Sequence, residues 1–276
     1  MEFFRSEQLF PGLIRIIDPS QTACYLAIGE NRACLIDTGI GIGDLRTYVD
    51  HLTDLPYDVV LTHGHFDHAS GAAQFADKHI YLHPSDKELM NWHTQPQKRL
   101  QYMRQVGGKA DFTLSDLIPV YFSENTLPLT AGQIFDLGGL TLEAIHTPGH
   151  THGMTMILMR ELRTILFGDG CGVFVLLLED CACTVEEYRN SLRSLKKYES
   201  LYDHILRQHG TFESPKELLD NVLECCDAVL EGTDDHQALD YAFVPGVKAF
   251  LAKKQNCQGR VDGKLGNLVY TPAKIR

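Results

Sequence analysis

The sequence predicts an α+β fold, a four-layer αββα sandwich in which two sheets pack face to face between outer helices. Two observations lead to it. Apolar segments of strand length precede helix signals in both halves of the chain, and each half places an acid beside glycine, at Asp37 and Asp169. With 276 residues, 44% of them hydrophobic, the chain can build a sizeable core. We expect one domain over residues 1–276, with ligand-bearing loops along one edge of the two sheets.

The first half is expected to contain short strands and one helix. The apolar run that ends at Thr62 is typical of a buried strand. The other strands are predicted at residues 13–17, 23–28, 33–36 and 80–82. A helix should follow His68 and bury Ala72, Ala73, Phe75 and Ala76.

The second half is expected to repeat this order. Strands are predicted at residues 140–145, 155–159 and 164–167. Two helix starts are indicated by a hydroxyl residue with Glu three positions later, because these side chains satisfy each other's backbone amides. The two pairs are Thr184 with Glu187 and Ser214 with Glu217, and the second helix should end at Gly232.

Residues 84–125 interrupt the strand pattern. Apolar side chains among Lys, Arg and Gln, ending at Gly107-Gly108, predict one or two helices with a hinge-like exit. Such an insertion either packs on the sandwich or another subunit, or borders the active site as a lid or wall. Trp92, the single tryptophan, and the flexible methionines would suit apolar substrates in the second case.

The strongest chemical signal is the segment His63-Gly64-His65-Phe66-Asp67-His68, directly after a predicted strand. Imidazole and carboxylate are preferred ligands of zinc and other first-row metals. A loop at a strand end can aim His63 and His65 to one side and Asp67 and His68 to another. One short segment could therefore serve two neighbouring metal ions.

Three later residues share one pattern, in which a metal-binding side chain ends an apolar strand beside small residues. They are His150 after Pro148-Gly149, Asp169 between two glycines, and His209 before Gly210. We expect these residues to complete the metal site, because further ligands should lie at other strand ends.

In these motifs the chain resembles the metallo-β-lactamase superfamily, whose pattern is His-x-His-x-Asp-His, then a single His, a single Asp and a last His. The resemblance covers nearly the whole chain in the correct order. It implies one metal held by His63, His65 and His150, a second held by Asp67, His68 and His209, and Asp169 bridging both. It also implies catalytic roles for Asp67 and Asp169. Asp37 would support the site, although a turn-initiating role explains it equally well.

Within the superfamily, Asp169 and the segment from Thr147 to Thr151 resemble glyoxalase-II-like and lactonase-like hydrolases. The resemblance implies a hydroxide that bridges two divalent ions and attacks an ester, thioester, lactone or phosphoester. Zinc is the expected metal, with iron or manganese as alternatives. A glutathione thioester is not indicated, because the region after His209 is short and has no matching substrate-binding part.

Two other functions stay open. An iron-dependent oxidoreductase, either diiron or similar to a persulfide dioxygenase that uses His63, His150 and Asp169, is the main alternative. A binding or regulatory protein is disfavoured by the complete ligand set. Fold alone does not choose among them.

Composition limits the partners. A net charge of −11 and a pI near 5.6 disfavour nucleic acid, which binds clustered Lys and Arg, so we expect a small-molecule substrate and leave a homo-oligomer open. We expect no membrane span and no signal peptide. Eight scattered cysteines then favour reduced thiols and a cytoplasmic location. Cys171 is expected to pack beside the metal pocket, and Cys181, Cys183, Cys225 and Cys226 lack partners for a metal site of their own.

Overall fold

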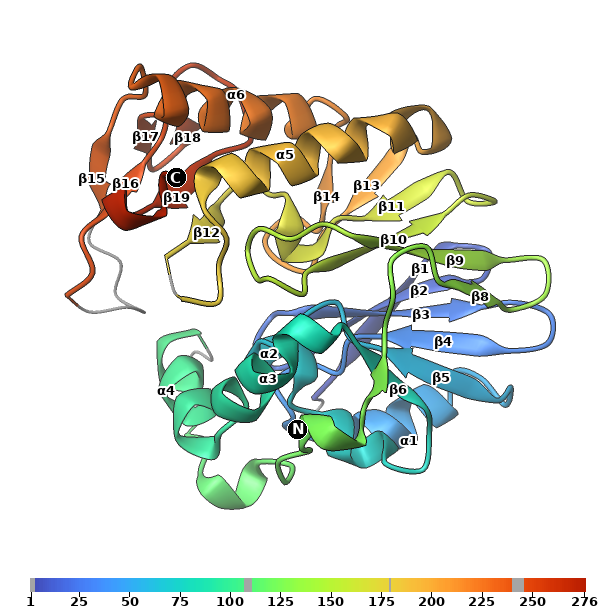
Figure 1. Ribbon diagram of the computed structural model, residues 1–276. Coiled ribbons are helices and arrows are strands. Elements are labelled where there is room, and N and C mark those ends of the chain that lie inside the picture. The colour runs from blue at the N-terminus through green and yellow to red at the C-terminus, as the bar shows by residue number, and fades with distance from the viewer. Residues whose placement is uncertain (1–2, 107–110, 179, 240–245) are drawn as a thin grey trace.

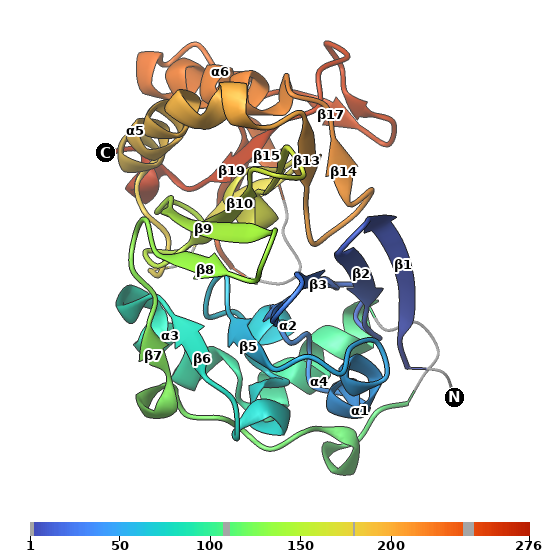
Figure 2. The same ribbon diagram turned by 90° about the vertical axis from the view of Figure 1, so that its right-hand side faces the viewer.

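Two sheets lie face to face in the centre of the molecule, and helices cover the outer face of each (Figures 1 and 2). The structure is a computed structural model that describes residues 3–106, 111–178, 180–239 and 246–276. It confirms the α+β sandwich expected from the sequence. Within the described residues, no helix is both long and apolar enough to cross a bilayer.

The first sheet has seven strands in chain order. They are β1 (Arg5–Phe10), β2 (Leu13–Ile17), β3 (Ala23–Ile28), β4 (Ala33–Ile36), β5 (Tyr57–Val60), β6 (Ile80–Leu82) and β7 (Leu127–Pro128). Strands β1 to β4 pair antiparallel, whereas β4 to β7 run parallel. The carboxyl ends of the parallel strands therefore meet at one edge, where the loop after β5 carries the His63–His68 motif. The predicted strands are confirmed, and β1 and β7 are additions.

The outer face of this sheet is covered by α1 (Leu45–Asp50), α2 (Phe66–Ala69) and α3 (Lys87–His93). The single helix predicted after His68 is wrong in its limits. Helix α2 begins inside the ligand motif, and a separate 3-10 turn spans Ala72–Phe75. The two are separated at Gly71, whose backbone lies so close to Thr38 that a Cβ there would be 2.2 Å from the Thr38 carbonyl oxygen. Ala72 and Phe75 are buried as predicted, but Ala76 is exposed.

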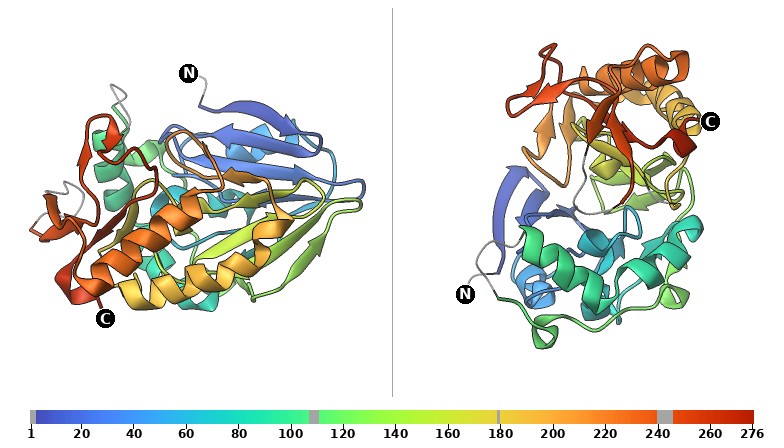
Figure 3. Two further views of the ribbon diagram at one scale, coloured as in Figure 1. Left: turned by 90° about the horizontal axis from the view of Figure 1, so that it is seen from above. Right: turned by 90° about the vertical axis from the view of Figure 1, so that its left-hand side faces the viewer.

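The second sheet has the order β14-β13-β11-β10-β9-β8. Its strands are β8 (Ile134–Asp136), β9 (Thr141–His146), β10 (Thr155–Met159), β11 (Thr164–Leu166), β13 (His204–Leu206) and β14 (Glu213–Ser214). Helices α5 (Val185–Leu195) and α6 (Leu218–Glu231) lie side by side across its outer face (Figure 3). Strands β11 and β13 are parallel, so the Asp169 and His209 loops leave the sheet next to each other.

The helix limits of this half are partly as predicted. The reciprocal cap between Thr184 and Glu187 is present at the start of α5. The Ser214 cap is wrong, because Ser214 pairs with Ile205 as part of β14 and α6 starts only at Leu218. The predicted end is confirmed, since Gly232 adopts a left-handed conformation with a φ of 68° after the last turn of α6.

A third sheet was not expected from the sequence. It has the order β12-β19-β16-β15, formed by β12 (Val175–Leu177), β19 (Leu268–Tyr270), β16 (Ala249–Leu251) and β15 (Gln237–Leu239). A small hairpin, β17 (Gln255–Asn256) and β18 (Gly259–Arg260), follows β16. Only a helix was expected from the sequence after His209, and these strands add to it. Strand β12 directly follows the Asp169 loop and pairs with β19, which places the end of the chain beside the site.

The insertion forms α3 and a second helix, α4 (Pro96–Val106), as predicted, and its described residues also form three 3-10 turns, at Pro84–Asp86, Leu114–Asp116 and Ser123–Asn125. The proposed hinge at Gly107-Gly108 lies outside the described residues. Helix α4 is fixed by Arg99, a fully buried side chain that donates to the carbonyl oxygens of Ile40, Gly41 and Ile118 at 2.6–2.9 Å. The insertion is therefore anchored to the loop that follows β4.

Candidate metal centre

The loop after β5 presents its histidines toward the second sheet. Nε2 of His63 lies 3.1 Å from Nδ1 of His65, and Nε2 of His150 lies 3.0 Å from the same atom. His150 comes from the turn after β9, where the backbone of Gly149 lies so close to Tyr188 of α5 that a Cβ would be 2.1 Å from its ring. These three nitrogens form the first metal-binding group.

A second group lies next to the first. Nε2 of His209 is 3.3 Å from Oδ2 of Asp67 and 3.3 Å from Nε2 of His68. His68 is fully buried, Asp67 is buried, and His209 is partly exposed. The three donor atoms are close enough together to hold one ion.

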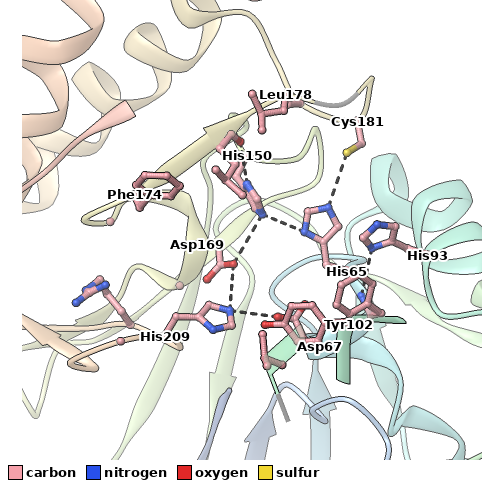
Figure 4. A pocket seen from close by; sticks show the side chains of 18 of the residues that line it. His65, Asp67, His93, Tyr102, His150, Asp169, Phe174, Leu178, Cys181 and His209 are labelled. Atoms are coloured by element: carbon pink, nitrogen blue, oxygen red, sulfur yellow. Dashed lines mark hydrogen bonds and ion pairs between the residues drawn. The ribbon is translucent and has the colours of Figure 1, made fainter. Parts of the chain in front are cut away.

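Asp169 reaches both groups. Its Oδ2 atom lies 3.7 Å from Nε2 of His150 in the first group. The same oxygen lies 3.5 Å from Nε2 of His68 and 3.4 Å from Nε2 of His209 in the second. The structure thus brings together all seven residues predicted from the sequence, from both halves of the chain. Figure 4 shows those that line the cavity, His65, Asp67, His150, Asp169 and His209.

The donor set fits divalent cations. Ring nitrogens that approach one another this closely repel as lone pairs unless a proton or a cation lies between them. The opposite ring nitrogens of several ligands are engaged elsewhere: Nδ1 of His68 donates to Asp37 at 2.9 Å and Nδ1 of His150 donates to the carbonyl of Leu176 at 3.0 Å. Such outer contacts fix the tautomer that leaves Nε2 free to bind metal.

Asp37 is a support for the metal centre and also a strained turn residue. Besides His68, it accepts hydrogen bonds from the backbone and hydroxyl of Thr62 at 2.7 and 2.8 Å and from Gln208 at 2.7 Å. Its φ of 63° is unusual for a residue other than glycine and marks a backbone held by these contacts. The supporting role expected from the resemblance therefore has a structural basis.

Asp86 is a second support, which sequence reasoning missed. It is almost fully buried, and its carboxylate accepts hydrogen bonds from the amide of Gly64 at 3.0 Å, the amide of Gly153 at 2.7 Å and the hydroxyl of Thr151 at 2.7 Å. It thereby ties the His63–His65 segment to the His150 turn. Its only sequence signal is an acid at the start of a helix, which is common where no site exists.

The two groups differ in electrostatics. Burial lowers the pKa values of His63 and His65 well below the usual range. Burial acts the same way on His68, but the nearby carboxylates outweigh it and raise its pKa well above the usual range. For His209 the balance between burial and Asp169 raises the pKa to about 10.

A cavity of about 580 Å³ opens beside the metal-binding residues. One wall comes from the insertion, including Lys98, Tyr102 and Val106 of α4, and the facing wall comes from the segment around β12. The interpretation of the insertion as a wall is thus supported, with most of that wall formed by α4. Trp92 does not line the cavity. It is 53% exposed, and Nζ of Lys98 lies 3.4 Å from the centroid of its ring.

The cysteines only partly take the roles expected of them. Cys171 has the expected packing role, fully buried in the apolar core beneath α5 and α6, but it does not line the cavity. The metal-binding groups found among the described residues contain no cysteine. Cys181 does line the cavity, with its Sγ atom 3.8 Å from Nε2 of His65, a proximity that the sequence pattern could not indicate.

A model of the metallo-beta-lactamase superfamily matches residues 17–202. The chain belongs to the metallo-β-lactamase superfamily. This family membership agrees with the resemblance in the ligand motifs and with the clustering of the seven ligands in space.

Relatives in the superfamily include two proteins named as thioesterases. The chain is 26% identical over 161 residues to the acyl-coenzyme A thioesterase MBLAC2 of Bos taurus, covering 52% of this chain and 56% of that protein. It is 26% identical over 178 residues to the atrochrysone carboxyl ACP thioesterase nsrC of Aspergillus novofumigatus, covering 59% and 44%. The chain thus spans about half the length of these curated relatives.

Solved structures share the fold. The metallo-beta-lactamase family protein TTHA1429 of Thermus thermophilus superimposes with a TM-score of 0.56 at 22% identity, over 82% of each chain. At this identity the likeness concerns the fold alone.

Proposed function

We propose that this protein is a hydrolase that uses two divalent metal ions to cleave an ester or thioester of a small molecule. The observation that carries the proposal is the position of Asp169, whose Oδ2 lies within 3.4–3.7 Å of imidazole nitrogens in both metal-binding groups. A carboxylate at this point can bridge two ions and fix their spacing. Zinc suits the mixed imidazole and carboxylate set best, and iron or manganese fit the same ligands.

The chemistry divides between the ions and the chain. When bound, two such ions lower the pKa of water toward about 7 and polarise a carbonyl group. The residues position the reaction: Asp37 and Asp86 hold the ligand loops, and the walls of the cavity would contact and orient the substrate. No side-chain nucleophile is required.

The choice of substrate class rests on two supports. The cavity wall around β12 is apolar, with Val173, Phe174, Leu176 and Leu178 among its lining residues, and suits an acyl group. Two relatives are named as thioesterases. The complete second group of Asp67, His68 and His209 favours the two-metal interpretation over a mononuclear iron oxygenase, which would need only His63, His150 and Asp169.

The test is a substrate panel on protein of known metal content. Chelator-treated protein is reconstituted with zinc, iron or manganese and assayed with chromogenic esters, thioesters, lactones and phosphodiesters. We expect ester or thioester turnover that vanishes on chelation and returns with added metal. Oxygen uptake with persulfide by the iron form, without hydrolysis of any panel member, would instead establish the oxidoreductase.

A further inference from the structure

Arg207 lies in the cavity wall, two residues before the ligand His209, and does not take part in the metal site described above. It is only 6% exposed. Within the described parts of the chain, no carboxylate forms an ion pair with it. A buried cation without a counter-ion is costly, so its presence in a ligand cavity calls for an explanation.

The guanidinium is held in place by neutral groups. Nε donates to the hydroxyl of Ser214 at 2.8 Å, and Nη2 donates to the hydroxyl of Thr211 at 2.7 Å. Hydroxyl acceptors fix the orientation of the side chain but leave its positive charge uncompensated. For Nη1, the described residues provide no hydrogen-bond acceptor.

The free side of the guanidinium can be approached from the cavity. Gly172 and Gly210 both line the cavity beside Arg207. A Cβ placed on Gly172 would lie 4.0 Å from Nη1, and one on Gly210 would lie 3.9 Å from it. Because both residues lack side chains, the space in front of Nη1 stays open to a ligand.

The charges around the cavity favour an anion. Among the described residues that line it, the carboxylates are Asp67 and Asp169, which both belong to the metal-binding groups, and the Lys and Arg residues are Lys98 and Arg207. Burial lowers the pKa of Arg207, and the charge of Asp169 acts in the opposite sense. An arginine remains protonated at neutral pH even so.

We propose that Arg207 binds an oxyanion of the substrate, so that the metal centre acts on esters or thioesters that carry a carboxylate or phosphate group away from the bond that is cleaved. This inference rests on the hydrolase function proposed above. Hydrogen bonds between guanidinium and oxyanion are charge-assisted and therefore stronger than those between neutral groups. The apolar residues around β12 would contact the hydrocarbon part that joins the two ends.

The test compares matched esters on zinc-loaded protein. The probes are 4-nitrophenyl hydrogen glutarate, which carries a free carboxylate, its neutral methyl ester, and 4-nitrophenyl 4-phosphonobutanoate. We expect the wild type to prefer an anionic ester over the neutral one at least about tenfold in kcat/KM, a factor within the worth of one charge-assisted hydrogen bond. The site prefers carboxylate if the glutarate ester has the larger kcat/KM relative to the neutral ester, and phosphate if the phosphonobutanoate ester has.

The preference should depend on Arg207. Arg207→Gln should reduce the ratio to near one, and Arg207→Lys should keep part of it, with metal content unchanged in both. Arg160→Gln is the control, because Arg160 is an exposed arginine paired with Glu143 at the end of β10 away from the ligands. A wild type without preference, or a preference retained in Arg207→Gln, would overturn the proposal.

Binding separates this proposal from the hydrolase function. Calorimetry on the zinc-loaded wild type compares N-methyl glutaramate, an anionic amide, with neutral N,N′-dimethyl glutaramide. Tighter binding of the anion that is lost in Arg207→Gln supports the anion site even if no ester is hydrolysed. Ester hydrolysis with equal binding of the two amides keeps the hydrolase function and rejects the anion site.

Discussion

The two metal-binding groups share a loop, a depth of burial and Asp169, yet they have opposite electrostatic characters. The first group, His63, His65 and His150, consists only of imidazoles. The second includes the carboxylate of Asp67, and its His68 contacts a further carboxylate, Asp37. Burial dominates the pKa values of His63 and His65, and lowers them, whereas the carboxylates outweigh burial at His68 and His209.

This difference indicates how the buried charges of the site are balanced when no metal is bound. In the first group the neutral imidazoles of His63 and His65 offer lone pairs to a cation. In the second group protons on His68 and His209 balance the buried carboxylates, and a metal ion must displace them. The supports follow the same division, because Asp37 contacts the second group and Asp86 holds the loops of the first.

Removing Asp169, which both groups share, should have the largest effect on metal content and turnover. Asp169→Ala should lose at least one metal equivalent and nearly all turnover, because both groups lose the carboxylate that joins them. Elemental analysis and ester hydrolysis would measure this, with Cys171→Ala as a control that changes a buried core residue of the same loop. Full activity in Asp169→Ala would contradict the two-metal mechanism.

Asp37 tests the second group most directly, because it contacts His68, whereas it reaches His63 of the first group only through the Thr62 hydroxyl. In Asp37→Asn an amide can replace the carboxylate oxygen that accepts hydrogen bonds from His68, Thr62 and Gln208. We expect the affinity of the second metal to fall about 10- to 100-fold, the usual effect of losing an outer contact to a ligand. Zinc titration of the metal-free variant would show one weakened step. Equal weakening of both steps would mean that the groups are not independently supported.

Asp86 provides the matched test of the first group. Asp86→Asn keeps the size of the side chain but removes one of the acceptors for Gly64, Thr151 and Gly153. An unsatisfied buried donor should lower the free energy of unfolding by about 1–3 kcal/mol. Denaturant unfolding and zinc titration together should show a less stable protein whose first step is weakened more than its second. A second step weakened more than the first would show that Asp86 does not support the first group.

The smallest expected effect is the difference between the two groups in the number of protons released when zinc binds. Since the pKa of His68 is raised and that of His209 is raised to about 10, both carry protons at pH 7 in the metal-free protein. The contribution of His209 to stability is full below about pH 6.5 and is lost as the pH rises through about 10, and that of His68 is lost as the pH rises through its own raised pKa. Filling the second group at pH 7 should release about two protons, from His68 and His209, whereas His63 and His65 of the first group have none to release. Zinc calorimetry in buffers of different ionisation enthalpy would measure this, and equal release in both steps would contradict the comparison.

The ligands were predictable from the sequence because each lies at the end of an apolar strand, and the strand ends of packed sheets meet at one edge. Contacts between distant segments were not predictable. Arg207 and Asp86 have ordinary local sequences, and their roles depend on what the fold places beside them. The third sheet was missed because its short strands come from segments far apart in the chain, and pairing at such a distance leaves no local pattern. The wall was assigned to the correct insertion, but the sequence did not show that Tyr102 lines the cavity and Trp92 does not.

The most direct test of the central claim is a crystal structure of the zinc-loaded protein with anomalous data at the zinc edge. The account predicts two peaks about 3.5 to 4 Å apart. One should be bound by His63, His65 and His150, the other by Asp67, His68 and His209, with Asp169 in contact with both. A single peak in fully loaded protein, or two peaks of which only one contacts Asp169, would contradict it.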